Sequence, residues 1–259
     1  MLGVRALDSK TRWLHWQPEG GRLNARLICF PHAGGGANVF RSWNRALPSS
    51  VQVCSLLLPG RETRFAEPNF KAFDPLLDTL FDELMPVLDM PYVVYGHSMG
   101  ALLAFEWVRR LQSAGHRMPQ HLFLSGRRAP HLPDTAGLMR MLPDREFVNE
   151  LTRRYEGISA DFLQEPELLQ LFLPMLRADI SVVESYVYRN GDQLSCPLTV
   201  AAGVHDSSVS YDQLLAWKRY TQSSFTARLY PGGHFYPQGL LLKAITAAFS
   251  EIPAASLVG

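Results

Sequence analysis

The sequence predicts an α/β protein with a mostly parallel central sheet flanked by helices, and two observations carry that prediction. Short apolar, β-branched runs alternate with longer segments of helical periodicity, which is the pattern of repeated β-α-β units. The chain has 259 residues, 47% of them hydrophobic, which is enough for one large domain with a sizeable core. We therefore expect residues 1–259 to form a single domain.

Six apolar runs are expected to be strands, and each ends near a glycine or a proline. They cover residues 26–30, 51–58, 92–95, 121–125, 198–202 and 226–230. The helix-like stretches that follow cover 38–47, 72–88, 99–114, 211–221 and 238–250. The stretch 99–111 is apolar almost all round, so we expect its helix to be buried at the centre of the fold.

The alternation breaks between residues 127 and 190, where several helix starts follow one another without a strand pattern. Amphipathic runs begin after Pro143 and at Pro166, Pro174 interrupts the second run, and a third covers 176–188. We expect this helical insertion, 127–190, to form a lid over an active site. Extra helices packed as ordinary structure are the alternative.

Composition excludes several classes of protein. The 25 Lys and Arg residues nearly balance the 24 Asp and Glu residues, so there is no field of one sign to attract nucleic acid or an anionic membrane. Cys29, Cys54 and Cys196 lack metal-ligand spacing and are expected to be buried thiols. No metal or cofactor is expected. With neither a signal peptide nor a membrane-length apolar run, we expect a cytoplasmic protein.

The pentapeptide Gly96-His97-Ser98-Met99-Gly100 has the G-x-S-x-G pattern and lies between an expected strand and an expected helix. In that context the serine occupies a sharp strand-to-helix turn, and the two glycines avoid collisions with the neighbouring strand and helix. A serine hydroxyl is a poor nucleophile without a base, an orienting acid and an oxyanion hole. We predict that Ser98 is the nucleophile of a serine hydrolase with the α/β-hydrolase fold.

The acid and the base are expected to follow Ser98 along the chain, in that order. His234 lies in a glycine-containing loop between the last expected strand and the final helix, which makes it the predicted base. Asp206 follows the strand at 198–202 and is predicted to orient the imidazole. Asp212 is the competing acid, but it falls in the first turn of a helix, where the helix dipole accounts for it.

Two backbone N–H groups are expected to form the oxyanion hole. Met99 supplies the first, since it directly follows the nucleophile. Ala33 is the candidate for the second, in the glycine-rich loop 31–36 that follows the strand at 26–30. This loop lacks the Gly-Lys-Ser/Thr ending and the G-x-G-x-x-G frame of phosphate-binding loops. His32 is expected to brace the loop rather than react.

Six blocks of sequence follow one another between residues 26 and 249. They are Phe30-Pro31-His32-Ala33-Gly34-Gly35, Leu58-Pro59-Gly60-Arg61-Glu62-Thr63-Arg64, Gly96-His97-Ser98-Met99-Gly100, Ser125-Gly126-Arg127-Arg128-Ala129-Pro130, Leu176-Arg177-Ala178-Asp179 and Gly232-Gly233-His234-Phe235. In this order and with this spacing they resemble the type II thioesterases, stand-alone enzymes that accompany polyketide synthases and nonribosomal peptide synthetases. The G-x-S-x-G block alone is not specific to this family, but the six blocks together are.

The resemblance implies hydrolysis of acyl groups from the phosphopantetheine arm of acyl or peptidyl carrier proteins, which clears misprimed or stalled synthase modules. It implies the triad Ser98, Asp206 and His234, an acyl-enzyme intermediate, and Ala33 and Met99 as oxyanion donors. It also implies a monomer that needs no cofactor of its own, since the substrate carries the phosphopantetheine. From the balanced charge we expect no nucleic-acid or membrane partner.

Two departures from the family pattern stand out. A paired-glycine turn is reduced to Gly157, inside the expected lid, which leaves the preferred acyl chain open. Many members carry proline after the acid, whereas Ser207 and Ser208 follow Asp206 here.

Four arginines are candidates for contacting an acidic carrier protein or the pantetheine phosphate, with solvated or internally paired arginines as the alternative; they are Arg61, Arg64, Arg127 and Arg128. Three rival functions stay open. A carboxylesterase or a product-releasing carrier thioesterase would keep the triad and change the substrate. A non-catalytic module that binds carrier proteins would not need Ser98, Asp206 and His234.

Overall fold

The computed structural model describes residues 11–16, 23–135, 137–155 and 165–250. Within them, seven strands form one sheet in the order β1-β3-β2-β4-β5-β6-β7. Neighbouring strands are parallel except for β1, which pairs antiparallel with β3 at the edge. The strands are β1 (Leu14–Trp16), β2 (Ala25–Phe30), β3 (Val51–Leu56), β4 (Tyr92–His97), β5 (His121–Ser125), β6 (Leu198–Gly203) and β7 (Phe225–Tyr230).

The mostly parallel sheet is confirmed, and all six expected strands are present within two residues of their predicted ends. Strand β1 was not predicted. Its three residues are too few for an alternating pattern to stand out, and its pairing with β3 is a contact between distant parts of the chain.

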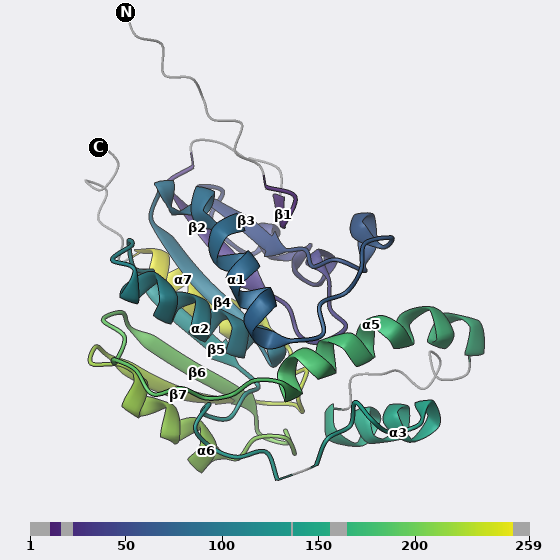
Figure 1. Ribbon diagram of the computed structural model, residues 1–259. Helices are drawn as coiled ribbons and strands as arrows, with labels where there is room; N and C mark the ends of the chain where they lie inside the picture. Colours follow the sequence, from purple (N-terminus) through teal and green to yellow (C-terminus); the bar gives the residue numbers. More distant parts are fainter. Residues whose placement is uncertain (1–10, 17–22, 136, 156–164, 251–259) are drawn as a thin grey trace, which may run out of the picture.

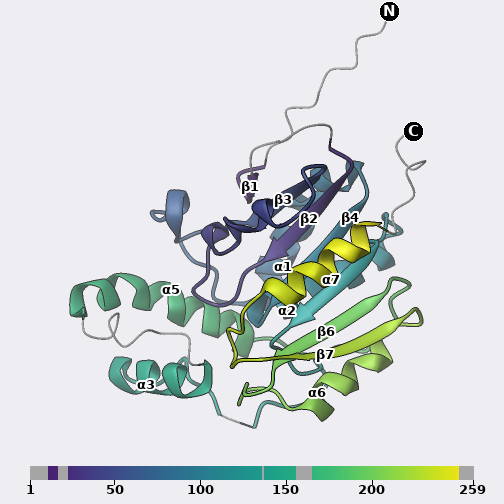
Figure 2. The same cartoon turned by 180° about the vertical axis from the view of Figure 1, so that it is seen from behind.

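Helices cover both faces of the sheet and one end of it. They are α1 (Phe73–Glu83), α2 (Met99–Ser113), α3 (Asp144–Tyr155), α5 (Pro166–Glu184), α6 (Tyr211–Leu215) and α7 (Gly239–Ser250). The two views place α1 and α2 on one face and α7 on the other (Figures 1 and 2). Helices α3 and α5 lie beyond one end of the strands, and we call them the cover helices (Figure 1).

Several expected helices are shorter than predicted. The stretch 38–47 forms two short 3-10 segments, η1 (Ala37–Phe40) and η2 (Trp43–Arg45). The stretches 72–88 and 211–221 each divide into an α-helix followed by a 3-10 segment, η4 (Met85–Asp89) and η5 (Ala216–Tyr220). In each case the apolar side chains still reach the core, because a 3-10 turn presents them with similar spacing.

The predicted break at Pro174 is wrong, because α5 runs without interruption from Pro166 to Glu184. Proline inside a helix removes one backbone hydrogen bond and crowds the preceding turn. Here the residues on both sides of it, Leu173 and Met175, are buried against the rest of the molecule. That packing outweighs the local preference of proline to end a helix.

Helix α2 is buried along most of its length, as predicted, and its close approach to the sheet depends on two glycines. A Cβ atom at Gly100 would lie 2.1 Å from the carbonyl oxygen of Phe30 on β2. A Cβ atom at Gly96 would lie 2.2 Å from the carbonyl oxygen of Gly100. Both contacts involve backbone atoms that cannot move aside, so the glycines fix where α2 begins.

The three cysteines are buried and unpaired, as expected. Among the described helices, none has the length and apolarity needed to span a membrane. The departure at Gly157 and the N-terminal residues used to exclude a signal peptide lie outside the described residues.

Candidate active site

Ser98 occupies the turn between β4 and α2 with a backbone conformation that side chains rarely adopt. Its φ of 55° and ψ of −112° lie outside the usual regions, and such a residue costs about 1–3 kcal/mol unless its surroundings hold it. The Ser98 N–H donates to the carbonyl oxygen of Ser125 on the neighbouring strand at 2.8 Å. The predicted elbow is present, and Ser98 lines a cavity.

The loops after β6 and β7 lie against one another and bring Asp206 to His234. The His205 N–H donates to the carbonyl oxygen of Gly232 at 2.9 Å. Nδ1 of His234 lies 2.8 Å from Oδ2 of Asp206, and both side chains are buried. His234 lines the same cavity as Ser98. Asp206 and His234 are therefore in contact, and Ser98 shares a cavity with His234, whereas Asp212 is exposed in the first turn of α6.

Ser208 also contacts this pair, a role that the sequence reasoning missed. Its hydroxyl donates to Oδ1 of Asp206 at 2.6 Å, and its N–H donates to the same oxygen at 2.9 Å. The hydroxyl also lies 3.1 Å from Nδ1 of His234. Burial by itself raises the pKa of Asp206. The hydrogen bond from His234, the charge of His234 and the hydrogen bonds from Ser208 outweigh burial and lower that pKa. The carboxylate is therefore held in its charged form.

His97 is buried and packs against the imidazole of His234, a contact that was also missed. Its Nδ1 lies 3.0 Å from the Ser125 hydroxyl, which is 2.6 Å from the hydroxyl of Tyr236. The centroids of the His97 and His234 rings are 4.9 Å apart. Burial, followed by the charges of His234 and His32, lowers the pKa of His97 well below its ordinary value. A neutral imidazole thus packs against the ring that would take up a proton.

The cavity has a volume of about 360 Å³, and its lining comes from two parts of the fold. Ser98, Met99 and His234 line it together with Ala33, and all four follow strands of the central sheet. The apolar wall comes from the cover helices, through Leu151, Tyr155, Phe172, Met175, Leu176, Ile180 and Val183. Such a chamber admits an apolar group of modest size next to Ser98.

Two backbone N–H groups at the cavity wall are available to an oxyanion. In the loop after β2, the Gly34 N–H donates to Asp179 at 2.8 Å and the Gly35 N–H donates to the His32 carbonyl at 2.9 Å. By contrast, the N–H groups of Ala33 and Met99 have no acceptor within the part of the chain that the structure describes. These are the two predicted donors.

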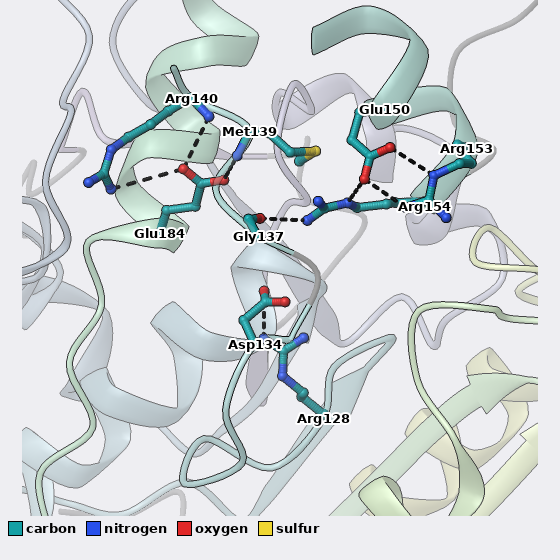
Figure 3. A network of polar contacts seen from close by, with 9 residues as sticks. All are labelled: Arg128, Asp134, Gly137, Met139, Arg140, Glu150, Arg153, Arg154 and Glu184. Atoms are coloured by element: carbon teal, nitrogen blue, oxygen red, sulfur yellow. Dashed lines mark hydrogen bonds and ion pairs between the residues drawn. The ribbon is translucent and has the colours of Figure 1, made fainter. Parts of the chain in front are cut away.

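Polar contacts tie both cover helices to the segment that leads from β5 to α3 (Figure 3). On α5, the Glu184 carboxylate accepts from the N–H groups of Met139 and Arg140. On α3, Glu150 pairs with Arg154, whose guanidinium donates to the Gly137 carbonyl at 3.1 Å. The apolar wall of the cavity is thereby anchored at both helices.

Three of the four candidate arginines are internally paired, so the alternative expectation is right for them. Arg61 pairs with Asp179 at 2.7 Å, and Arg64 pairs with Glu67 at 2.6 Å. Arg128 pairs with Asp134 at 2.6 Å (Figure 3). Arg127 instead lines the cavity, and burial together with the charge of Arg128 lowers its pKa.

Comparison with known proteins assigns the family. A thioesterase domain model matches residues 25–253. The chain belongs to the thioesterase family. This thioesterase is 41% identical over 211 residues to the gramicidin S biosynthesis protein GrsT of Aneurinibacillus migulanus, covering 82% of each chain. It is 40% identical to the thioesterase PikA5 of Streptomyces venezuelae, covering 82% of this chain and 75% of that one.

Solved structures agree with this assignment. The type II thioesterase BorB from the borrelidin biosynthetic cluster superposes with a TM-score of 0.81 at 34% identity, covering 92% of this chain and 96% of that one. The predicted α/β-hydrolase fold and the family resemblance are confirmed. The protein is an enzyme that hydrolyses thioesters.

Proposed function

We propose that this thioesterase removes acyl groups from the phosphopantetheine arm of carrier proteins in nonribosomal peptide or polyketide biosynthesis. The observation that carries the proposal is the cavity itself, which Ser98 and His234 line together with apolar side chains of the two cover helices. A thioester carbonyl at Ser98 would place its acyl chain against those side chains.

The chemistry follows from the arrangement of the three side chains. His234 takes the proton of the Ser98 hydroxyl as the serine oxygen attacks the thioester carbonyl carbon. Asp206, bonded to Nδ1, leaves Nε2 for this proton and stabilises the imidazolium. The N–H groups of Ala33 and Met99 bind the oxyanion. The carbon–sulfur bond then breaks, and the pantetheine sulfur leaves as a thiol with the proton from His234.

Hydrolysis of the acyl-enzyme repeats these roles with water as the nucleophile. His234 takes a proton from the water, which attacks the ester carbonyl carbon, and then returns a proton to the Ser98 oxygen. The products are the free acid and the regenerated serine. No cofactor takes part, because the phosphopantetheine arrives with the substrate.

The size of the cavity favours editing over product release. A volume of about 360 Å³ is near the lower limit for ligand cavities, which run from roughly 300 to 1,000 Å³. It suits a short starter or extender unit better than a finished peptide or polyketide. The relatives are named for gramicidin S and borrelidin biosynthesis, which supports carrier proteins of such synthases as the partners. We further propose that the enzyme acts as a cytoplasmic monomer.

The test compares turnover of three substrate types by the purified enzyme: short acyl- or aminoacyl-carrier proteins, mature product thioesters and aryl esters. We expect the short carrier-bound thioesters to give the highest kcat/KM. Strong preference for aryl esters with no carrier activity would indicate a carboxylesterase, and preference for mature thioesters would indicate product release. If a fluorophosphonate does not label Ser98, the protein would instead be a non-catalytic module that binds carrier proteins.

A further inference from the structure

Asp179 of α5 reaches the loop that carries the candidate oxyanion donor Ala33. Its Oδ2 accepts a hydrogen bond from the Gly34 N–H at 2.8 Å. The same carboxylate binds the Arg61 guanidinium through both oxygens, at 2.8 Å and 2.7 Å. Arg61 in turn donates to the carbonyl oxygen of Gly35 at 2.8 Å. The side chains of Asp179 and Arg61 are each only 4% exposed.

These contacts hold one peptide group from both sides. The peptide between Ala33 and Gly34 has its N–H on Asp179, and its carbonyl oxygen lies 2.9 Å from Nδ1 of His32. Through the Cα of Ala33 it is joined to the preceding peptide, which carries the Ala33 N–H, so holding it restricts how far that N–H can turn. Gly34 has a φ of 79°, a left-handed conformation that glycine adopts readily. Because glycine has no Cβ atom, it also has more backbone freedom than other residues, and the contacts with Asp179 and His32 restrict that freedom.

The same helix also forms the apolar wall of the cavity. Met175, Leu176, Ile180 and Val183 all come from α5 and line the chamber beside Ser98. A Cβ atom at Gly34 would lie 2.4 Å from Cδ2 of Leu176, so helix and loop are in direct contact. One helix thus contacts both the space for the acyl group and the loop for the oxyanion.

A buried ion pair needs a reason beyond stability, because desolvation of two charges offsets most of their attraction. Arg61 and Asp179 bind each other, and they also bind the Gly34 N–H and the Gly35 carbonyl oxygen. These contacts fix the conformation of the loop. Catalysis by an oxyanion hole depends on such fixed geometry, because donors that must reorient during the reaction lose most of their effect.

We propose that Asp179, held by Arg61, is a positioning residue for the oxyanion hole, which aims the Ala33 N–H only while α5 is docked over the cavity. The proposal rests on the function proposed above. On this account the oxyanion hole is complete only when α5 packs over the cavity. A substrate that holds α5 in place therefore also holds the loop that stabilises the oxyanion.

The test uses Asp179→Asn, which keeps the size of the side chain and an acceptor oxygen but removes the charge that holds Arg61. We measure kcat and KM for a short acyl-pantetheine thioester, and the affinity of a trifluoromethyl ketone analogue, which forms an oxyanion on Ser98. We expect kcat to fall by about 10- to 100-fold, a fraction of the effect of deleting an oxyanion donor. KM should change by less than about threefold, and the analogue should lose affinity by the same factor as kcat.

The matched control is Asp144→Asn, which breaks the exposed ion pair between Asp144 of α3 and Arg177 of α5. It disturbs the same helix without touching the loop and should leave kcat unchanged. Arg61→Lys keeps the charge but cannot make the paired contacts of the guanidinium with Asp179 together with its contact with Gly35, so it should give a smaller loss with the same signature. It serves as the second variant should Asp179→Asn fail to fold.

A loss confined to KM, or a fall in kcat with unchanged affinity for the analogue, would overturn the proposal. The rate of phosphonylation of Ser98 by a fluorophosphonate separates this outcome from failure of the proposed function. Its phosphoryl oxygen occupies the oxyanion hole whatever the natural substrate is. Slower labelling of Asp179→Asn than of the wild type and of Asp144→Asn is expected even if no carrier-bound thioester is hydrolysed, and equal labelling would contradict the positioning role.

Discussion

Nδ1 of His234 lies 2.8 Å from Oδ2 of Asp206, across loops that begin at the ends of two neighbouring strands. This contact fixes the tautomer that leaves Nε2 for proton exchange. Asp206→Asn would present an amide N–H to the ring and favour the wrong tautomer. We expect kcat to fall by about 10⁴-fold with little change in Tm.

The control for this variant is Asp212→Asn, which changes the exposed competitor in the first turn of α6. Steady-state kinetics on one acyl thioester should show a near-normal rate for it. If Asp212→Asn were severe and Asp206→Asn mild, the assignment of the acid would be wrong.

Ser208 should contribute to catalysis through Asp206. Ser208→Ala removes the hydroxyl that donates to Oδ1 but leaves the backbone N–H on the same oxygen. Hydrogen bonds to charged groups contribute about 1.5–3 kcal/mol, and part of that would be lost, so we expect kcat to fall by about tenfold. The pKa of Asp206 should rise toward its ordinary value, which NMR titration of the carboxyl carbon can follow. An unchanged rate together with an unchanged titration would refute this role.

The stability of the protein should depend on pH through His97. Its pKa is lowered by burial, so between its ordinary value of about 6.5 and the lower folded value the unfolded chain binds a proton that the folded protein does not. Stability is therefore unaffected above that ordinary pKa and falls as the pH drops below it. In the wild type this proton lowers the free energy of unfolding by about 1.4 kcal/mol for each pH unit below 6.5, and His97→Gln should remove that contribution. Urea unfolding at several pH values measures the slope, and equal slopes for both proteins would contradict the account.

The approach of α2 to β2 should tolerate no side chain at Gly100. Gly100→Ala would place a Cβ atom 2.1 Å from the Phe30 carbonyl oxygen, which is backbone and cannot rotate away. We expect a loss of several kcal/mol, at least as large as the roughly 1–3 kcal/mol typical of overpacking, and a displaced Ser98. Gly239→Ala is the comparison, because a Cβ atom there meets nothing within 4 Å and the backbone is not in the left-handed region. Thermal unfolding that ranks the two variants equally would argue against the close approach.

The sheet and the triad could be predicted because local signals mark them. Ser98 sits in a recognisable turn, and Asp206 and His234 follow strands whose order the fold dictates. These signals need only the neighbouring residues, and in the structure Asp206 contacts His234, which lines the same cavity as Ser98.

The remaining features depend on contacts between residues far apart in the sequence. Nothing near Arg61 announces that it pairs with Asp179, which lies 118 residues away. The continuity of α5 through Pro174 depends on packing that local propensity does not register. Ser208 and His97 lie beside triad residues, but their hydrogen bonds became visible only with the loops in place.

The most direct test of the account is the rate at which the enzyme removes a short acyl group from a carrier protein, followed by intact mass spectrometry of the carrier. Wild type should release the acyl group catalytically, and Ser98→Ala should be slower by a factor on the order of 10⁴–10⁶ while remaining folded. Release by Ser98→Ala at a rate near that of wild type, or by wild type no faster than in buffer, would contradict it.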